Sequence, residues 1–242
     1  MTHNRAKRWK MQDKSTANDN SASSVTVTLP TLLALAAGFV DACTFLAFAG
    51  FFVAQVTGSY VVAGSEIAAH NFQPSIKILA IPVFVLAGIL TTLIVRSVGE
   101  NWRAALTITL CVEAVLLGGL SLTGVVDLPS GLGDIPALLG LSAMGVQSAL
   151  VRLLLANYGS TNVMTTNTTQ LSIEITDSFL RGGVSLKLLQ VGSIMLGFLS
   201  GVGIGSFAYG NLGLASTIFP AGLVLCIAGV EAWRGTVKSV RV

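Results

Sequence analysis

Two short polar triplets interrupt the apolar segments of this chain. Each lies just before a stretch that can form a short helix, Tyr60–Ala69 in one case and Thr168–Thr176 in the other. Hydroxyl, amide and backbone N–H groups at such a break can replace the hydration shell of a small solute. The positive ends of two helix dipoles would favour an anion or a polar group there. The first triplet is Thr57, Gly58 and Ser59, and the second is Thr165, Thr166 and Asn167.

The triplets occupy equivalent positions in an internal repeat. An offset of 108 residues also aligns Glu66 with Glu174. An offset of 107 aligns the run GFVDA, which contains Asp41, with GVQSA, which contains Gln147 and Ser148. A repeat of this length indicates a duplicated structural unit.

Composition places both units in a lipid bilayer. The chain is 52% apolar and 10% charged, with a mean hydropathy of +0.77, whereas a soluble domain carries about 25% charged residues. No basic cluster indicates nucleic-acid binding. The three cysteines lie in apolar runs and do not suggest a disulfide framework, and no motif implies a cofactor or a metal. The expected partners are the bilayer and a small solute, and a homo-oligomer is compatible with the sequence.

The apolar segments predict an all-α polytopic membrane protein with two repeats. Each repeat should contain three transmembrane helices and one broken or re-entrant element, in which a strand-like arm leads into a half-helix. Spans are expected at 27–49, 76–95, 104–123, 135–156, 186–207 and 213–233. The predicted parts are a disordered basic tail (1–26), repeat 1 (27–123), a connecting loop (124–134), repeat 2 (135–233) and a short tail (234–242).

Two topologies are compatible with this pattern. If 51–70 and 159–178 re-enter, each half crosses three times and the second half is inverted. If they cross the bilayer, each half crosses four times and the halves are parallel. The inverted arrangement with cytoplasmic termini puts 13 of the 14 basic residues inside and leaves only Lys77 outside, which favours it by the positive-inside rule.

The first half of each repeat resembles the YoaK-like (DUF1275) family. GFVDACTFLAFAGFFVAQVTGS, from Gly38, is similar to one family signature, and AMGVQSALVRLLLANYGSTNVMTTNTTQL, from Ala143, is similar to another. The resemblance covers about residues 27–233. It implies a bacterial protein of the cytoplasmic (inner) membrane with six spans. The family's usual Thr-Gly-Asn and Gln-Asn-Ala runs are altered here, because Ser59, Thr166 and Ser148 replace the expected residues.

Several ionisable residues lie within or beside the apolar segments, where they are costly and therefore functional candidates. Asp41 and Glu113 lie deep in predicted spans and could couple transport to a proton or a cation, or serve helix packing. Arg152 matches an arginine of the family signature and could instead snorkel to the interface. Glu66 and Glu174 lie near the ends of the predicted short helices.

These features favour a secondary transporter or permease for a small polar or anionic solute. A non-transporting membrane scaffold or sensor is the first alternative. An intramembrane enzyme would need a paired set of groups, for which Asp41 and Glu113 are the only candidates, so no enzymatic activity is expected.

Overall fold

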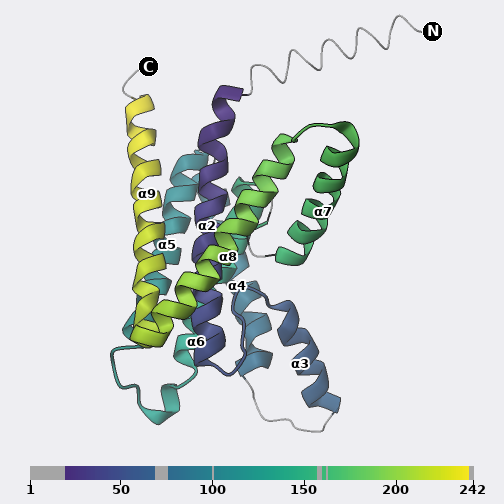
Figure 1. Cartoon of the computed structure of the whole chain (residues 1–242). Coiled ribbons are helices and arrows are strands. Elements are labelled where there is room, and N and C mark those ends of the chain that lie inside the picture. The colour runs from purple at the N-terminus through teal and green to yellow at the C-terminus, as the bar shows by residue number, and fades with distance from the viewer. Residues whose placement is uncertain (1–19, 69–75, 100, 157–159, 162, 240–242) are drawn as a thin grey trace, which may run out of the picture.

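The structure, a computed structural model, describes residues 20–68, 76–99, 101–156, 160–161 and 163–239, and its regular elements there are all helices (Figure 1). Two short helices are α3 (Thr57–Ala68) and α7 (Met164–Arg181), and two 3-10 turns are η1 (Ser130–Leu132) and η2 (Gly213–Thr217). The long helices are α2 (Asn20–Ala47), α4 (Ile76–Val98), α5 (Trp102–Leu122), α6 (Ile135–Leu154), α8 (Leu186–Leu212) and α9 (Ile218–Ser239).

Five stretches are long and apolar enough to cross a membrane. Four coincide with α2, α4, α5 and α6, and the fifth, Leu186–Gly235, contains both α8 and α9. The 3-10 turn η2 separates these two helices, which run in opposite directions in Figure 1. The described chain therefore has the architecture of a multi-pass membrane protein, with long helices at all six predicted spans.

The broken elements differ from the prediction in two respects. Residues 51–56 are irregular, and no strand occurs in the described part of the chain. The prediction of a strand-like arm was therefore wrong. The arm makes no ladder because it has no neighbouring strand. Both short helices also begin earlier than predicted, so each polar triplet lies within a first helical turn or directly beside it. Of the predicted disordered tail 1–26, residues 1–19 lie outside the described residues, whereas 20–26 form the beginning of α2. His70–Pro74, between α3 and α4, also lie outside the described residues.

The two halves run in opposite directions (Figure 1). α2 descends from the upper end of the molecule, whereas its repeat partner α6 ascends from the lower end. α4 ascends and its partner α8 descends, while α3 and α7 start between the two ends and point away from each other. As a result, α2 begins and α9 ends at the same end of the bundle. We refer to this as the terminal end.

Helix contacts also exchange between the halves. α2 packs on α8, and the equivalent α6 packs on α4. α3 packs on α4 as α7 packs on α8, and α5 packs on its own partner α9. Thus the first helix of each half contacts the third helix of the other half. The halves interlock rather than forming separate bundles.

Glycines allow the closest of these contacts. A Cβ on Gly201 of α8 would overlap the Leu35 carbonyl of α2, and one on Gly205 would lie 2.7 Å from the Phe39 carbonyl oxygen. In the other half, a Cβ on Gly145 of α6 would lie 2.8 Å from the Ala87 Cβ of α4. Small residues at such interfaces let helix backbones approach closely, which favours helix association in lipid.

A matched glycine pair tests this contact. Gly201→Ala should destabilise the protein by about 1–3 kcal/mol, because α8 must move away from α2 to make room for the methyl group. Gly203→Ala on the same helix has no atom within 4 Å of the new Cβ and should be neutral or slightly stabilising. Thermal unfolding of both variants in detergent measures the difference. Equal melting temperatures would contradict the tight α2–α8 interface.

Candidate functional site: the cavity between α3 and α7

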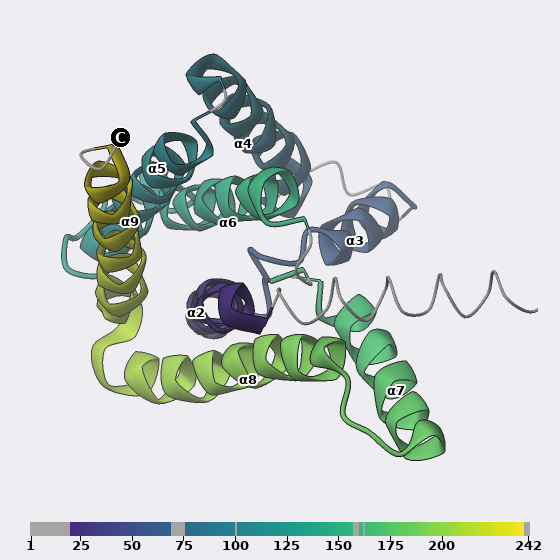
Figure 2. The same cartoon turned by 90° about the horizontal axis from the view of Figure 1, so that it is seen from above.

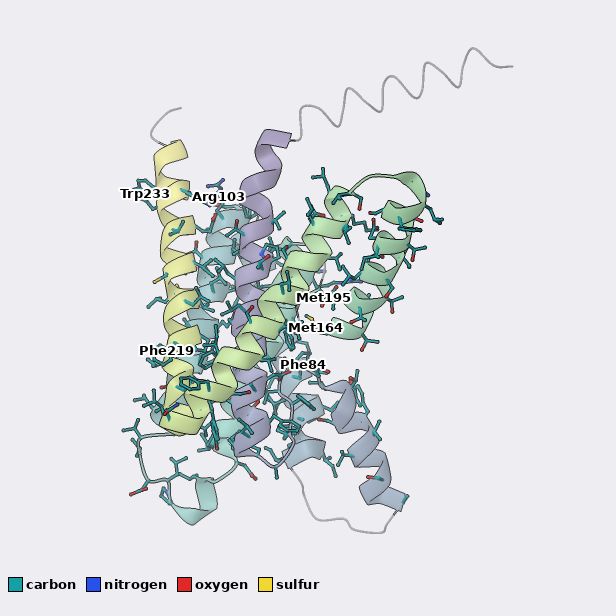
Figure 3. All side chains as sticks on the ribbon, in the orientation of Figure 1. Phe84, Arg103, Met164, Met195, Phe219 and Trp233 are labelled. Carbon is teal, nitrogen blue, oxygen red and sulfur yellow. The ribbon has the colours of Figure 1, made fainter. Side chains whose placement is uncertain are left out.

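A cavity of about 280 Å³ lies where the two short helices begin. α3 and α7 lie on the same side of the bundle (Figure 2). Figure 3 places Met164 of α7 and Phe84 of α4 near each other, between the two ends of the molecule. The lining comes from both halves of the chain and comprises Ala54, Gln55, Val56, Thr57, Tyr60, Phe84, Ser148, Val163, Met164 and Thr165.

The structure brings the first residue of each predicted triplet to this cavity. Thr57 and Thr165, which are equivalent under the repeat, both line it, and so does Ser148. The lining has apolar walls and several hydroxyl or amide groups, with no charged side chain among the described residues. It can therefore accept a small molecule through hydrogen bonds and apolar contact, without a fixed counter-charge.

The other triplet residues lie outside the lining. Gly58 and Thr166 are exposed, whereas Ser59 and Asn167 are buried. The N–H groups of Gly58 and Ser59 donate to the carbonyls of Gln55 and Val56, at 3.3 and 2.9 Å. These two N–H groups, which were expected to be open to a solute, instead close the turn that begins α3.

Asp41 fixes the irregular arm that leads into α3. Its Oδ1 accepts hydrogen bonds from the backbone N–H groups of Val53 at 3.0 Å and Ala54 at 2.7 Å. The residue is 2% exposed, and its second oxygen, Oδ2, is buried without a hydrogen-bond partner. Asp41 therefore accepts hydrogen bonds from backbone N–H groups of the arm that have no partner in a helix or strand. One of the two residues bonded to it, Ala54, lines the cavity.

Gln147 plays the corresponding part in the second half. Its Nε2 donates to the Thr161 hydroxyl at 3.2 Å and to the Leu33 carbonyl of α2 at 2.9 Å. Asn167 adds a hydrogen bond from its amide to the Ser160 carbonyl. The second arm is thus held by amides, whereas the first is held by a carboxylate.

Glu113 lies in the interior of the bundle, away from this cavity. It is fully buried in α5, and both of its carboxyl oxygens lack a hydrogen-bond partner. The two predicted acidic candidates are therefore not hydrogen-bonded to each other. A buried carboxyl group without a partner is costly to maintain, which distinguishes Glu113 from an ordinary packing residue.

The remaining predicted ionisable residues also lie outside the cavity. Arg152 is exposed near the end of α6. Glu174 in α7 accepts hydrogen bonds from Ser185 at 2.7 Å and Gln170 at 2.8 Å, with the Lys187 ammonium at 3.7 Å. The Ser185 contact chiefly, together with the others, lowers the pKa of Glu174 below its ordinary value of 4.5. These bonds join α7 to α8.

Glu66 belongs to α3, and the environment of its side chain lies outside the described residues.

Sequence reasoning missed several lining residues. Tyr60 and Phe84 are aromatic residues in apolar surroundings, and nothing in their spacing marks them. Phe84 reaches the cavity only because α4 packs on α6, which is a contact between halves. Gln55 could have been noticed, since it is the one polar side chain in the arm 51–56.

A helical bundle interrupted by two short, oppositely directed helices at a shared cavity has the architecture of a polytopic α-helical membrane protein. Residues 29–230 match the family described as "Protein of unknown function (DUF1275)", and the chain belongs to this family, as the sequence resemblance indicated. Neither a curated protein nor a solved structure matches the chain.

Two variants of Asp41 separate its bonds from its charge. Asp41→Asn keeps an acceptor oxygen for Val53 and Ala54 and should stay close to the wild type in stability. Asp41→Ala leaves two N–H groups without an acceptor and should cost roughly 1–3 kcal/mol for each group that stays buried. Thermal unfolding of the purified variants distinguishes them, and equal stability of Asp41→Ala and the wild type would show that the arm is not held by this carboxylate.

Proposed function

We propose that the chain is a secondary transporter or permease for a small polar or anionic solute, which binds between α3 and α7. The observation that supports this most directly is the shared cavity, which the repeat-equivalent residues Thr57 and Thr165 line from opposite halves. Secondary transporters commonly bind their substrate between the two repeats, at broken helices near the bilayer midplane.

In this proposal the halves form an inverted repeat and the short elements are re-entrant. The opposite directions of equivalent helices support the inversion, and the exchanged contacts support a pseudo-two-fold relation. Neither α3 nor α7 is among the stretches able to span a membrane. Irregular backbone at membrane depth is tolerated where protein or a water-filled cavity surrounds it, which fits the arms beside this cavity.

The lining narrows the class of solute. Hydrogen-bond groups come from Thr57, Thr165, Ser148, Gln55 and Tyr60, while Phe84 and Met164 are among the apolar contacts. The absence of a cationic side chain among the described lining residues argues against a compact multivalent anion. The α3 and α7 N-termini supply only partial positive charge. A small solute with one polar or singly charged group and an apolar part fits best.

Two buried carboxyl groups are the proposed coupling sites. Asp41 is in direct contact with the arm beside the cavity, through Val53 and Ala54, and its buried Oδ2 is the proposed position for a proton or a cation. Glu113 is a second candidate because both of its oxygens are unpartnered. Ionisable groups within membrane segments commonly mark ion or proton pathways. Arg152, Glu66 and Glu174 remain candidates for gating.

We further propose that the terminal end faces the cytoplasm of a bacterial inner membrane. Four arginines lie near helix ends that are at the terminal end of the bundle, namely Arg96, Arg103, Arg152 and Arg234. The opposite loop, 124–134, contains two aspartates and no basic residue. Positive charge is enriched on the cytoplasmic side of membrane proteins.

Cysteine labelling tests the orientation. Val126→Cys, in the loop 124–134, should react with a membrane-impermeant maleimide in intact cells, because that side chain is 57% exposed at the proposed outer end. Ser97→Cys, exposed at the end of α4, is the matched control and should react only after permeabilisation. Cys226→Ser is the background, since Cys226 is the one exposed native cysteine. The reverse pattern would overturn the proposed orientation.

Three valine variants test the binding site. A panel of monocarboxylates, amino acids and neutral polyols is first screened for stabilisation of the wild-type protein, because a ligand that binds the native state raises its melting temperature. Thr57→Val and Thr165→Val should each weaken the binding of a stabilising solute by roughly 1–3 kcal/mol, since the change removes a hydroxyl group from the contact. Thr166→Val is the matched control, exposed beside Thr165 but outside the lining.

Equal losses in all three variants, or none, would place the solute elsewhere. If no member of the panel stabilises the wild type, and a reporter cysteine at Thr57 stays unreactive to a water-soluble reagent, the cavity is dry. The chain would then fit a scaffold or a sensor better than a transporter.

A further inference from the structure

A second, separate cavity lies at the terminal end, between the beginning of α5 and the end of α9. Its volume is about 480 Å³. Its lining comprises Asn101, Arg103, Ala104, Thr107, Ile108, Glu231, Ala232 and Gly235. None of these residues lines the cavity between α3 and α7. The proposed solute site therefore leaves this second cavity unexplained.

Two hydrogen-bond donors in the lining lack a partner. The Arg103 Nη1 and the Thr107 Oγ1 are both buried atoms without a hydrogen bond. The two residues are four apart on α5, so they lie one turn apart on the same face of the helix. Hydroxyl groups in helices often donate to the carbonyl four residues earlier, as Thr109 does, and Thr107 does not.

The charges around the cavity leave one positive charge in excess. Glu231 is 7% exposed and is the only carboxylate among the described residues of the lining. It is already paired with Arg234, whose guanidinium Nη1 lies 2.8 Å from its Oε1. Arg103 makes no ion pair with it. Among the side chains that the structure describes here, two guanidinium groups and one carboxylate give a net charge of +1, and Arg103 is the one without a carboxylate partner.

Two exposed tryptophans lie next in the chain to residues of this cavity. Trp102 and Trp233 are 47% and 70% exposed and adjoin the lining residues Arg103 and Ala232 in the chain. Figure 3 shows Trp233 and Arg103 close to the terminal end of the bundle. Exposed tryptophans are typical of the membrane–water interface. Basic pockets between helices on the cytoplasmic side are suited to anionic lipid headgroups.

We infer that this cavity binds a phosphate group through Arg103 and Thr107, and that the phosphate belongs to an anionic phospholipid of the surrounding leaflet. A guanidinium and a hydroxyl can donate to two oxygens of one phosphodiester, whose single negative charge balances the excess of +1. The side-chain oxygen of Asn101 accepts a hydrogen bond from the Ala104 N–H and so is already used within α5.

A neighbouring apolar cavity supports a lipid rather than a soluble anion. It has a volume of about 410 Å³ and lies between α2 and α9. It shares Glu231 with the cavity that contains Arg103 and Thr107. Its walls are mainly aliphatic, from Leu29, Leu32, Leu223, Ile227 and Val230. An acyl chain fits such a surface, whereas inorganic phosphate gains nothing from it.

Ligand-dependent stability of the purified full chain tests this site. Dihexanoyl phosphatidylglycerol is titrated into the protein in a neutral detergent, in parallel with dihexanoyl phosphatidylcholine and inorganic phosphate, and the melting temperature is followed. Phosphatidylglycerol should stabilise the wild type at the lowest concentration. Arg103→Gln should raise the midpoint about tenfold or more, because it removes a charge-assisted hydrogen bond.

Thr107→Val, which keeps the charge and the shape, should raise the midpoint by a smaller factor, about threefold to tenfold. Arg181→Gln is the control, because Arg181 lies at the terminal end but is exposed and paired with Asp177. An unchanged midpoint in both Arg103→Gln and Thr107→Val would overturn the site. Equal stabilisation by inorganic phosphate would assign it to a soluble anion, and equal stabilisation by phosphatidylcholine would overturn the selection of an anionic headgroup.

Discussion

The structure depends on how the polar backbone is satisfied where the first helix of each half is followed by an irregular arm. A continuous helix satisfies its own N–H and C=O groups, but an arm in a bilayer cannot use water freely. In the first half the Asp41 carboxylate accepts the N–H groups of Val53 and Ala54. In the second half Gln147 and Asn167 hold the turn at 160–161. These contacts hold the two arms from which α3 and α7 begin, and residues of both arms line the one cavity.

The two halves solve the same problem with different chemistry. Asp41 aligns with Ser148, which lines the cavity, whereas the residue that holds the second arm is Gln147, one position earlier. Only the first arm is therefore attached through a group that can change its charge. A proton or a cation at Asp41 would alter the hydrogen bonds of one arm and leave the other unchanged. The repeat therefore gives the two arms equivalent positions, while the different residues that hold them would make the arms respond differently to a proton or a cation.

Much of this fold could be predicted from the sequence, because long apolar segments and a duplicated pattern are strong signals. The six long helices, the equivalence of Thr57 with Thr165 and the burial of Asp41 all follow from residue types and spacing. The arm 51–56 was predicted as strand-like because it is apolar, yet its backbone is held by a side chain twelve residues earlier, and no local pattern encodes that contact. Phe84 and Gln55 depend in the same way on which helices meet.

The interlocked contacts also define which parts of the molecule could move together. One unit consists of α2 and α8, which are joined by close glycine contacts, together with α7, which packs on α8. The other unit consists of α6 and α4, which are joined at Gly145, together with α3, which packs on α4. Each unit thus contains helices of both halves, and the cavity lies between them, lined by Thr57, Phe84 and Ser148 on one side and by Thr165 on the other. Each arm connects one unit to the other.

Because Asp41 of α2 holds the arm that leads to α3, and Gln147 of α6 bonds to both α2 and the second arm, any displacement of one unit against the other must strain or break these hydrogen bonds. In the proposed transporter, the groups that stabilise the two arms are therefore also the groups that would couple binding in the cavity to movement of the helices.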